Sequence, residues 1–383
     1  VQIDRTTDEV DVGLRYADNG FTLALNWYLS EFDNGNTGYG WQHPFTTVPG
    51  AETAELAASP DNRFQQIAFS AGYAFATWDT YAIMSAAIGE IEQTEPFLAY
   101  TRNASLTTSA LPRSNLAGSI DTTRYAFLLT SKPTKKSRVR VSYNYDERDN
   151  KTAQDLWNRV IADSFISNDP QLNIPYSFER STLRASAEYK LLKALRLSAG
   201  YDRVNKDFDF QEIDEQTEET GWGRVRWRPL DTIDVDIRGG AAKRDIDSYN
   251  EMFAQALGQN PLMRKYNLAY RYRNFGELTV TYSPTTAPLT LSLTGMRTDD
   301  EYSKSQIGLT SGDELRFGAD LSWQTAENTT IYLNAGSEEI SSTQIGGAAG
   351  APTWRADYDD DFMTIGAGFV MRNVAEKFDL FFD

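Results

Sequence analysis

The sequence predicts an all-β protein, a large antiparallel up-and-down transmembrane β-barrel that occupies residues 1–383 as a single domain. Three observations lead to this prediction. Apolar and polar residues alternate with a period of two along nearly the whole chain, which is typical of strands with one oily and one wet face. No run of about 18 apolar residues occurs, so a helical membrane protein is excluded. Short turns alternate with long polar loops, as in outer-membrane barrels.

The strand pattern is clearest in the middle of the chain. Residues 182–191 alternate strictly, and residues 195–202 repeat the pattern after the tight connection Leu192-Lys193-Ala194. Similar segments bring the total to about sixteen strands, many longer than the ~9–11 residues that a tilted strand needs to cross a bilayer. Two short stretches could be helical, Gln154–Phe165 and Ser248–Gly258, and both fall in loops.

Connection lengths predict two different rims. Tight turns of a few residues alternate with longer polar loops, so one rim of the barrel should carry the turns and the other the loops. In outer-membrane barrels the turns are periplasmic and the long loops extracellular. The long loops are expected near residues 33–63, 93–120, 149–178, 248–265 and 342–357.

The apolar face should contact lipid. Alternation alone would also suit a soluble two-sheet sandwich, but Tyr and Trp gather near the strand ends on this face, as in the aromatic girdles of membrane barrels. Leu, Val, Ile and Ala fill the middle of each stripe. The residues predicted to face lipid are Leu183, Leu195, Leu197, Val235, Leu291 and Leu321.

The polar face should form a wet, charged lumen. Three arginines precede one hairpin turn and two aspartates follow it, so opposite charges should lie side by side across the strands. These groups either satisfy one another as an ion-pair network or contact a polypeptide threaded through the barrel. The candidates for such contacts are Arg184, Glu188, Arg196, Asp202, Arg224, Arg226, Arg228, Asp234, Asp236 and Arg238.

Composition excludes several kinds of chemistry for this chain. It has no Cys, which rules out disulfides, zinc–thiolate sites, iron–sulfur clusters and covalent haem attachment. Its one histidine, His43, is expected on the surface of a long loop and has no recognisable catalytic partner. The net charge of −17 argues against nucleic-acid binding. We therefore predict no enzymatic activity, no catalytic residues and no cofactor-binding or metal-binding residues.

Two acidic segments stand out and are expected in loops. Asp299–Glu301 is one, and Asp357 with Asp359–Asp361 is the other. Such carboxylates could hold calcium, but neither segment has the ligand spacing and glycine of an EF-hand loop. Solvated loop charge is the preferred interpretation.

Several strand-and-turn phrases resemble the MtrB/PioB family of decahaem-associated outer-membrane barrels. They are Asn173–Arg180 with the strands that follow it, Glu218–Trp222, and Ile307–Thr310 leading into Leu315–Trp323. The resemblance is clearest from about residue 173 to residue 335. No single phrase is diagnostic by itself.

The resemblance implies a barrel in the bacterial outer membrane that sheathes and insulates a periplasmic multihaem, decahaem-like cytochrome. The partner would carry the haem c, a second multihaem cytochrome could dock outside, and the complex would move electrons across the membrane. Family members have more strands than counted here, and the best-known branch has a Cys-x-x-Cys pair that this chain lacks. We therefore expect that a segment is missing at one or both ends and that the full-length protein has more strands.

Two other functions compete with the conduit. A solute-diffusion or substrate-selective porin would need an inward constriction loop, and Asp149–Phe178 is long enough to be one. An export barrel would normally bring an attached periplasmic domain or plug. The exact strand number, the identity of the cytochrome and the direction of electron flow cannot be read from the sequence.

Overall fold

One large sheet makes up most of the computed structural model, which describes residues 3–43, 48–256, 258–348, 351–374 and 377–382. Within these residues the sheet has 17 strands, and three small two-stranded sheets accompany it. All strands of the large sheet except β17 follow one another in chain order as an antiparallel meander. This confirms the predicted all-β fold and agrees with the expected number of strands.

The meander strands are long, and most exceed the length needed to cross a bilayer. Their bounds are β1 (Arg5–Asp18), β2 (Phe21–Asn34), β5 (Asn62–Phe75), β6 (Thr80–Gln93), β7 (Gly118–Thr134), β8 (Ser137–Asn150), β13 (Ser177–Leu192), β14 (Leu195–Asp209), β15 (Glu215–Leu230), β16 (Ile233–Ile246), β18 (Arg271–Tyr282), β19 (Leu289–Glu301), β20 (Ile307–Ala326), β21 (Thr329–Gly346), β22 (Trp354–Val374) and β23 (Phe378–Phe382).

The short elements lie in the connections. They are β3 (Gly38–Gln42), β4 (Thr53–Ala57), the 3₁₀ turn η1 (Thr77–Asp79), β9 (Leu156–Trp157), β10 (Val160–Ile161), β11 (Phe165–Ile166), β12 (Gln171–Leu172), α1 (Glu251–Ala256) and β17 (Met263–Arg264). No helix in the described part of the chain is long and apolar enough to cross a membrane.

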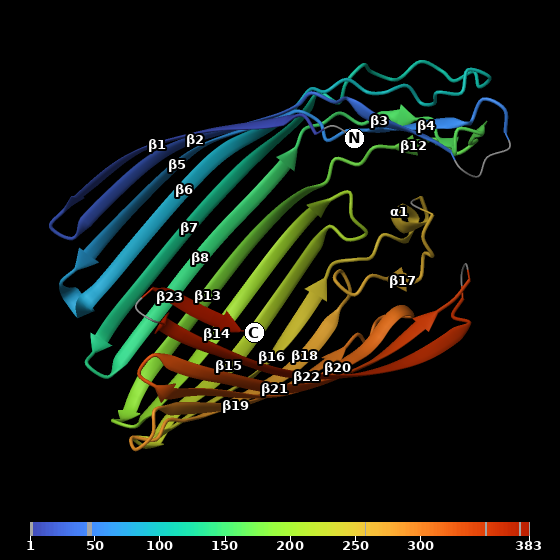
Figure 1. Cartoon of the computed structure of the whole chain (residues 1–383). Coiled ribbons are helices and arrows are strands. Elements are labelled where there is room, and N and C mark those ends of the chain that lie inside the picture. Colours follow the sequence, from blue (N-terminus) through green and yellow to red (C-terminus); the bar gives the residue numbers. More distant parts are fainter. Residues whose placement is uncertain (1–2, 44–47, 257, 349–350, 375–376, 383) are drawn as a thin grey trace.

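The sheet curls from β1 round to β22 and β23, with the tight turns on one rim and the long loops on the other (Figure 1). Asn19 and Gly20 form one of these turns, and both have positive φ angles, as a two-residue hairpin turn requires. Strands β1 and β23 are the edges, because no pairing within the described residues joins them. The alternation of turns and loops agrees with the prediction.

Two expectations about the connections are wrong. Gln154–Phe165 is not helical, because its residues form the short strands β9 and β10 and begin β11, and two-residue pairings hold them. The 342–357 connection is mostly strand, because β21 continues to Gly346 and β22 begins at Trp354. The expected helix in 248–258 does form, as α1. The glycine-rich tip 346–350 lies partly outside the described residues.

The register gives the sheet one apolar and one polar face. Leu197 on β14 is opposite Tyr189 on β13 and Val225 on β15, and Val225 is opposite Ile237 on β16. The apolar face is continuous next to the turns, as in Leu315–Trp323 of β20, and becomes polar beyond about the length that crosses a bilayer. Asp313 is the next residue on that face.

Buried apolar residues gather in the loops and at the loop ends of strands. Ala51, Ile213 and Leu268 in the connections, and Ile307 at the start of β20, are almost fully buried. By contrast, the large apolar residues along the meander are half-buried or exposed, such as Leu197 with 38% exposure. This inverted distribution is expected where lipid covers the apolar face.

Candidate functional site on the polar wall

All ten predicted lumen residues lie on the polar face of β13–β16. Arg184 is opposite Asp202, Glu188 is opposite Ser198, and Arg196 is opposite Arg226. The remaining five are carried onto the same face by the β15–β16 register. The polar face is the inner face of the curve, because the loop segment that carries β17 is held by polar-face side chains of β15 and β16 and reaches across the curled sheet to β20. We call this face the inner wall.

The predicted ion pairs form across the β15–β16 hairpin. The Arg224 guanidinium donates two hydrogen bonds to Asp236, one of them 2.7 Å long from Nε to Oδ1. Arg228 binds Asp234 in the same way, at 2.7 and 3.0 Å. Arg226 lies 3.4 Å from Asp236. Opposite charges therefore sit side by side near the turn, as the order of residues along the hairpin predicts.

Glu188 on β13 makes two further contacts, one to β14 and one to this hairpin. Glu188 lies 3.8 Å from both Arg196 and Arg226. Arg184 and Asp202 are direct neighbours across the strands, but no ion pair joins them within the described residues. Arg238 instead lies over the rings of Trp222 and Phe275, at 5.1 and 5.6 Å from their centres. The sequence-predicted set thus divides into ion-paired members and members with other surroundings.

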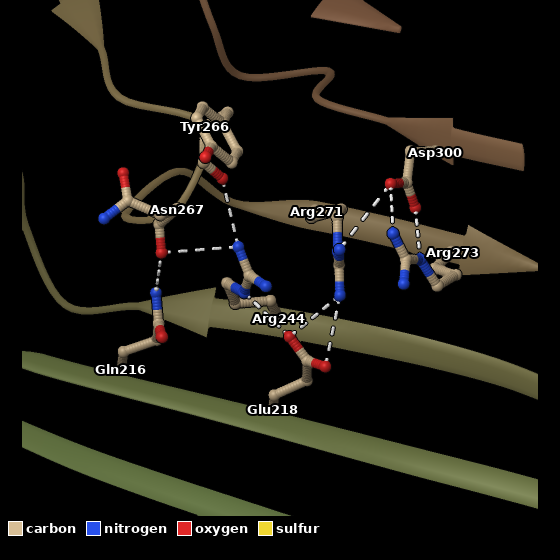
Figure 2. Close-up of polar contacts among 8 residues, drawn as sticks. All are labelled: Gln216, Glu218, Arg244, Tyr266, Asn267, Arg271, Arg273 and Asp300. Carbon is tan, nitrogen blue, oxygen red and sulfur yellow. Dashed lines mark hydrogen bonds and ion pairs between the residues drawn. The ribbon is translucent and has the colours of Figure 1, made fainter. Parts of the chain in front are cut away.

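A second charged cluster lies at the loop end of the inner wall. Glu218 on β15 accepts hydrogen bonds from Arg244 at 2.7 Å and from Arg271 at 3.1 Å. Arg271 also lies 3.6 Å from Asp300, which accepts two hydrogen bonds of 2.6 Å from Arg273. Figure 2 shows this chain of alternating charges running from β15 to β19. We call it the rim network.

The rim network was missed by sequence reasoning. Its members come from four strands, and only the register brings them together. Arg271 is buried, with a side-chain exposure of 9%, so its charge is satisfied by the two carboxylates. A signal did exist, since Glu218, Arg244 and Arg273 occupy polar-face positions of their strands. Which of these side chains lie close together could not be deduced without knowing how the connecting loops set the register of the strands.

One arginine of the rim network, Arg244, also binds a loop. Arg244 Nη1 donates to the carbonyl oxygens of Tyr266 and Asn267, at 3.1 and 3.4 Å, and Gln216 donates to Asn267 at 2.9 Å (Figure 2). Tyr266 and Asn267 belong to the segment 258–270 between α1 and β18, which we call the strap. Because its anchors stand on the inner wall, the strap lies at the loop-side mouth of the lumen.

The strap spans several strands. Its β17 pairs in parallel with the start of β20, and Asn260 donates to the carbonyls of Gly347 and Ala348 at 3.1 Å. Lys265 binds Glu212, whose side chain is fully buried. Burial and the nearby Glu212 charge raise the pKa of Tyr249, which lies in the same loop. The strap is therefore a fixed part of the mouth.

Three other long loops pack against one another as a loop cluster. Asn103, almost fully buried, donates to the carbonyls of Pro49 at 3.5 Å and Asp163 at 2.8 Å. It therefore links the loops that precede β5, β7 and β13. Arg102 pairs with Glu55 at 2.8 Å, and Arg113 pairs with Asp155. The predicted constriction loop, Asp149–Phe178, belongs to this cluster.

The inner wall of β2, β5, β6 and β7 contrasts with the charged wall. Small residues such as Ala68, Ser70 and Ala87 line a shallow cavity of about 500 Å³. Its charged residues, Arg124 and Asp146, pair with each other at 2.8 Å. One part of the wall is therefore smooth and nearly neutral, and the part from β13 to β18 is rich in arginine.

The six residues predicted to face lipid all lie on the apolar face. Leu291 on β19 is opposite Leu321 on β20, and Leu195 and Val235 flank Trp227 of β15. Where this face becomes polar, tyrosine hydroxyls bind carboxylates, as Tyr201 does with Glu219 at 2.6 Å. The six residues predicted to face lipid, all on this face, are Leu183, Leu195, Leu197, Val235, Leu291 and Leu321.

The acidic segments are not loops. Asp299–Glu301 ends β19, and Asp357 with Asp359–Asp361 lies within β22. Because strand side chains alternate, Asp359 and Asp360 point to opposite faces.

In the described part of the chain, no three His, Asp or Glu side chains converge as a metal site. The imidazole Nδ1 of His43 is buried and has no hydrogen-bond partner there, which differs from a free surface histidine.

Comparison with protein families gives one match over the whole chain. Residues 2–383 match the family model described as outer membrane beta-barrel porin, MtrB/PioB. The chain is 28% identical over 379 residues to Outer membrane protein MtrB of Shewanella baltica (strain OS185). That alignment covers 98% of this chain and 53% of the relative. The chain therefore spans about half the length of the curated relative it matches.

Solved structures of similar fold are outer-membrane proteins. The copper transporter OprC matches with a TM-score of 0.56 at 11% identity, over 97% of this chain and 59% of OprC. The ferric-catecholate import receptor Fiu of E. coli K12, in its closed form, matches with a TM-score of 0.51 at 12% identity, over 97% and 58% of the two chains. At this identity the likeness concerns the fold alone.

Proposed function

Because this chain belongs to the MtrB/PioB family of outer-membrane β-barrel porins, we propose that it walls in a multihaem c-type cytochrome and so insulates an electron conduit across the outer membrane. The family is a class of barrels and porins, not of enzymes. The protein is located in the outer membrane. The cytochrome, which carries the haem c, and its electron transfer are the parts that we propose.

The charged inner wall is the observation that favours this function. Rows of arginine, glutamate and aspartate cross β13–β18, with ion pairs at both the turn end and the loop end. Such an arrangement has a fixed register and suits contact with a folded polypeptide. The chain itself has no Cys and one His. A covalently attached haem c would therefore be carried by a partner, because its attachment needs cysteine.

Insulation gives the wall a physical purpose. The bilayer core is about 30 Å thick and excludes charged groups and water. A row of haems in contact with lipid would lose its polar surroundings and its fixed spacing. A barrel wall with an apolar outer belt and a polar inner face supplies both, while the haems stay on the partner.

The decisive experiment compares the full-length barrel with and without its partner. Liposomes contain a redox dye attached to a polymer, and the external reductant is a particle too large to pass through lipid or through an empty barrel. We expect no dye reduction with the haem-free barrel. Reduction should occur once the co-purified cytochrome, identified by haem staining, is reconstituted with the barrel. Leakage of small solutes should fall at the same time because the lumen is filled. The conduit proposal would be overturned if small solutes passed freely through the barrel and the cytochrome neither bound the barrel nor changed that flux.

The loop cluster is where we place a second, extracellular multihaem cytochrome. Its loops are tied together by Asn103, so they present a fixed surface. On that surface Leu156 and Leu172 are paired across β9 and β12, and each is 56% exposed. Adjoining exposed apolar side chains on a fixed surface outside the membrane belt give a partner protein an apolar contact to bury. Loss of the external cytochrome in Leu156→Ser/Leu172→Ser, with the inner one retained, is the expected result.

A substrate-selective porin is the second candidate. The strap supports it, because Arg244 and Gln216 hold this segment at the mouth of the lumen, as an inward loop would be held in a porin. The porin would pass small solutes without any partner. The liposome experiment therefore separates the two functions.

A further inference from the structure

The turn end of the inner wall carries more positive than negative charge. We define the cationic wall as Lys190, Arg196, Arg224, Arg226, Arg228 and Arg238, with the carboxylates Glu188, Asp234 and Asp236 among them. Glu277 on β18, opposite Arg238, is a fourth carboxylate on this part of the wall, so six cations face four carboxylates. The chain as a whole has a formal charge of −17, so this excess runs against the overall charge.

The cations of one row stand directly opposite one another. Lys190 on β13 is opposite Arg196 on β14, which is opposite Arg226 on β15. Like charges in direct cross-strand positions destabilise a sheet. The row is compensated only in part: Glu188 lies 3.8 Å from Arg196 and from Arg226, and Asp236, opposite Arg226 at 3.4 Å, is shared with Arg224. Within the described residues no carboxylate pairs with Lys190.

Arg196 and Arg226 are more exposed than the carboxylates nearest to them. The side chains of Arg196 and Arg226 are 49% and 44% exposed, whereas those of Glu188 and Asp236 are 25% and 29% exposed. Beside this row Glu188 and Asp236 lie deeper than the guanidinium groups, whereas Asp234, in its pair with Arg228, is 53% exposed. The five arginines of the cationic wall, with Asp234, Asp236 and Glu277, line a cavity of about 690 Å³ on the inner wall. A partner would meet positive charge first.

The position of this cationic wall is also informative. Lys190 precedes the β13–β14 turn and Arg228 the β15–β16 turn, so the wall borders the rim of short turns. In outer-membrane barrels this rim is periplasmic. A polypeptide that enters the lumen from the periplasm has to pass it. Complementary charge at an entrance accelerates association and fixes the orientation of the partner.

From these observations we propose that the cationic wall docks a carboxylate-rich surface, made of Asp and Glu side chains, on the polypeptide held in the lumen. This inference rests on the proposed function, because it assigns the charge and location of the contact with that polypeptide. Guanidinium groups match carboxylates in geometry and can bind them through two parallel hydrogen bonds. The bound carboxylates would neutralise the row Lys190–Arg196–Arg226.

The test reverses the row and compares it with a matched set. The variant Lys190→Glu/Arg196→Glu/Arg226→Glu is made in the full-length protein. The control Arg15→Glu/Arg124→Glu/Arg316→Glu reverses three inner-wall arginines on β1, β7 and β20. The folded fraction of each barrel is measured by its heat-dependent shift in gel migration. Haem absorbance per folded barrel is then measured after affinity capture at low and at high salt.

We expect the row variant to lose about tenfold or more of the captured haem, and the control to keep most of it. Low-salt and high-salt capture should differ for the wild type and much less for the row variant. Amidation of the carboxylates of the haem-containing partner, before it is reconstituted with the wild-type barrel, should reproduce this loss of captured haem.

Two failures are distinguishable. If the wild type captures haem and the row variant captures as much as the control, the docking proposal is overturned and the conduit stands. If the wild type captures no haem protein, the proposed function itself is overturned, and the docking proposal with it.

Discussion

Leu197 on β14 lies within the apolar belt, and Val235 on β16 lies on the same face one row nearer the turns, level with Leu195 and Trp227. Arginine at Leu197 should cost about 2–4 kcal/mol of folding free energy in lipid, because it places a charge inside the bilayer, and arginine at Val235 should cost less because this residue lies nearer the interface. Ser198 is the matched control, since it faces the inner wall between Glu188 and Arg224. Urea unfolding in lipid vesicles measures the difference. A greater loss for Ser198→Arg would invert the assignment of faces.

A carboxylate at the turn rim provides a pH test. Asp79 in η1 accepts a hydrogen bond from Lys132, and this contact lowers the pKa of Asp79 below its ordinary 3.8. A depressed folded-state pKa contributes stability above the unfolded value and loses it as the pH falls through the folded value. Asp79→Asn should therefore destabilise the barrel at neutral pH and have no effect in strong acid. In a Lys132→Gln background the substitution should have no effect at either pH.

Residue-level prediction succeeded where a side chain has one dominant environment. The apolar stripe through Leu183 and Leu197 could be assigned from alternation, because lipid requires every outward residue of the belt to be apolar. Beyond the belt the outward face meets water and the signal disappears. That is why Asp357 and Asp359, which alternate along β22 with other polar residues, suggested a loop.

At the scale of elements, the strap depends on one glycine. Gly308 at the start of β20 has a φ of +117°, and a Cβ there would lie 2.4 Å from the carbonyl oxygen of Arg264. Gly308→Ala should therefore separate β17 from β20 and loosen residues 258–270. We expect faster tryptic cleavage after Arg264 or Lys265, and higher solute flux through the partner-free barrel.

Gly312→Ala on the same strand is the control for this prediction. A Cβ at Gly312 meets no atom within 4 Å, and its φ is ordinary for a strand. Its cleavage rate and flux should match those of the wild type. Equal behaviour of the two variants would mean that β17 does not hold the strap.

The strap and the rim network were beyond sequence reasoning for a physical reason. Strands are predicted from local alternation, but the parallel pairing of β17 with β20 joins residues that are 44 positions apart, as Met263 and Ile307 show. Loop contacts such as Asn103 with Pro49 depend on how three connections fold against each other. Ion pairs across a tight hairpin, as in Arg228–Asp234, could be predicted because the turn fixes the register.

The orientation of the whole molecule can be tested on intact cells. The loop cluster should lie outside the cell and the short turns in the periplasm, as in other outer-membrane barrels. Added protease should nick residues 33–63, 93–120 or 149–178 and spare the lysine-rich turn Lys132–Lys136. Permeabilised cells provide the comparison in which that turn becomes accessible. Cleavage at Lys135 or Lys136 in intact cells would reverse the orientation.

The strands are longer than the membrane is thick, and this sets the height of the wall. Strand β20 has 20 residues, which at about 3.3 Å per residue and a tilt of about 40° rise roughly 50 Å. The hydrocarbon layer is only about 30 Å thick. The surplus stands on the loop side, where the outward face is polar, as a collar through the headgroup and sugar layers. Electrons delivered at its mouth would leave the wall above the lipid surface, so an acceptor too large to penetrate that layer could still be reached.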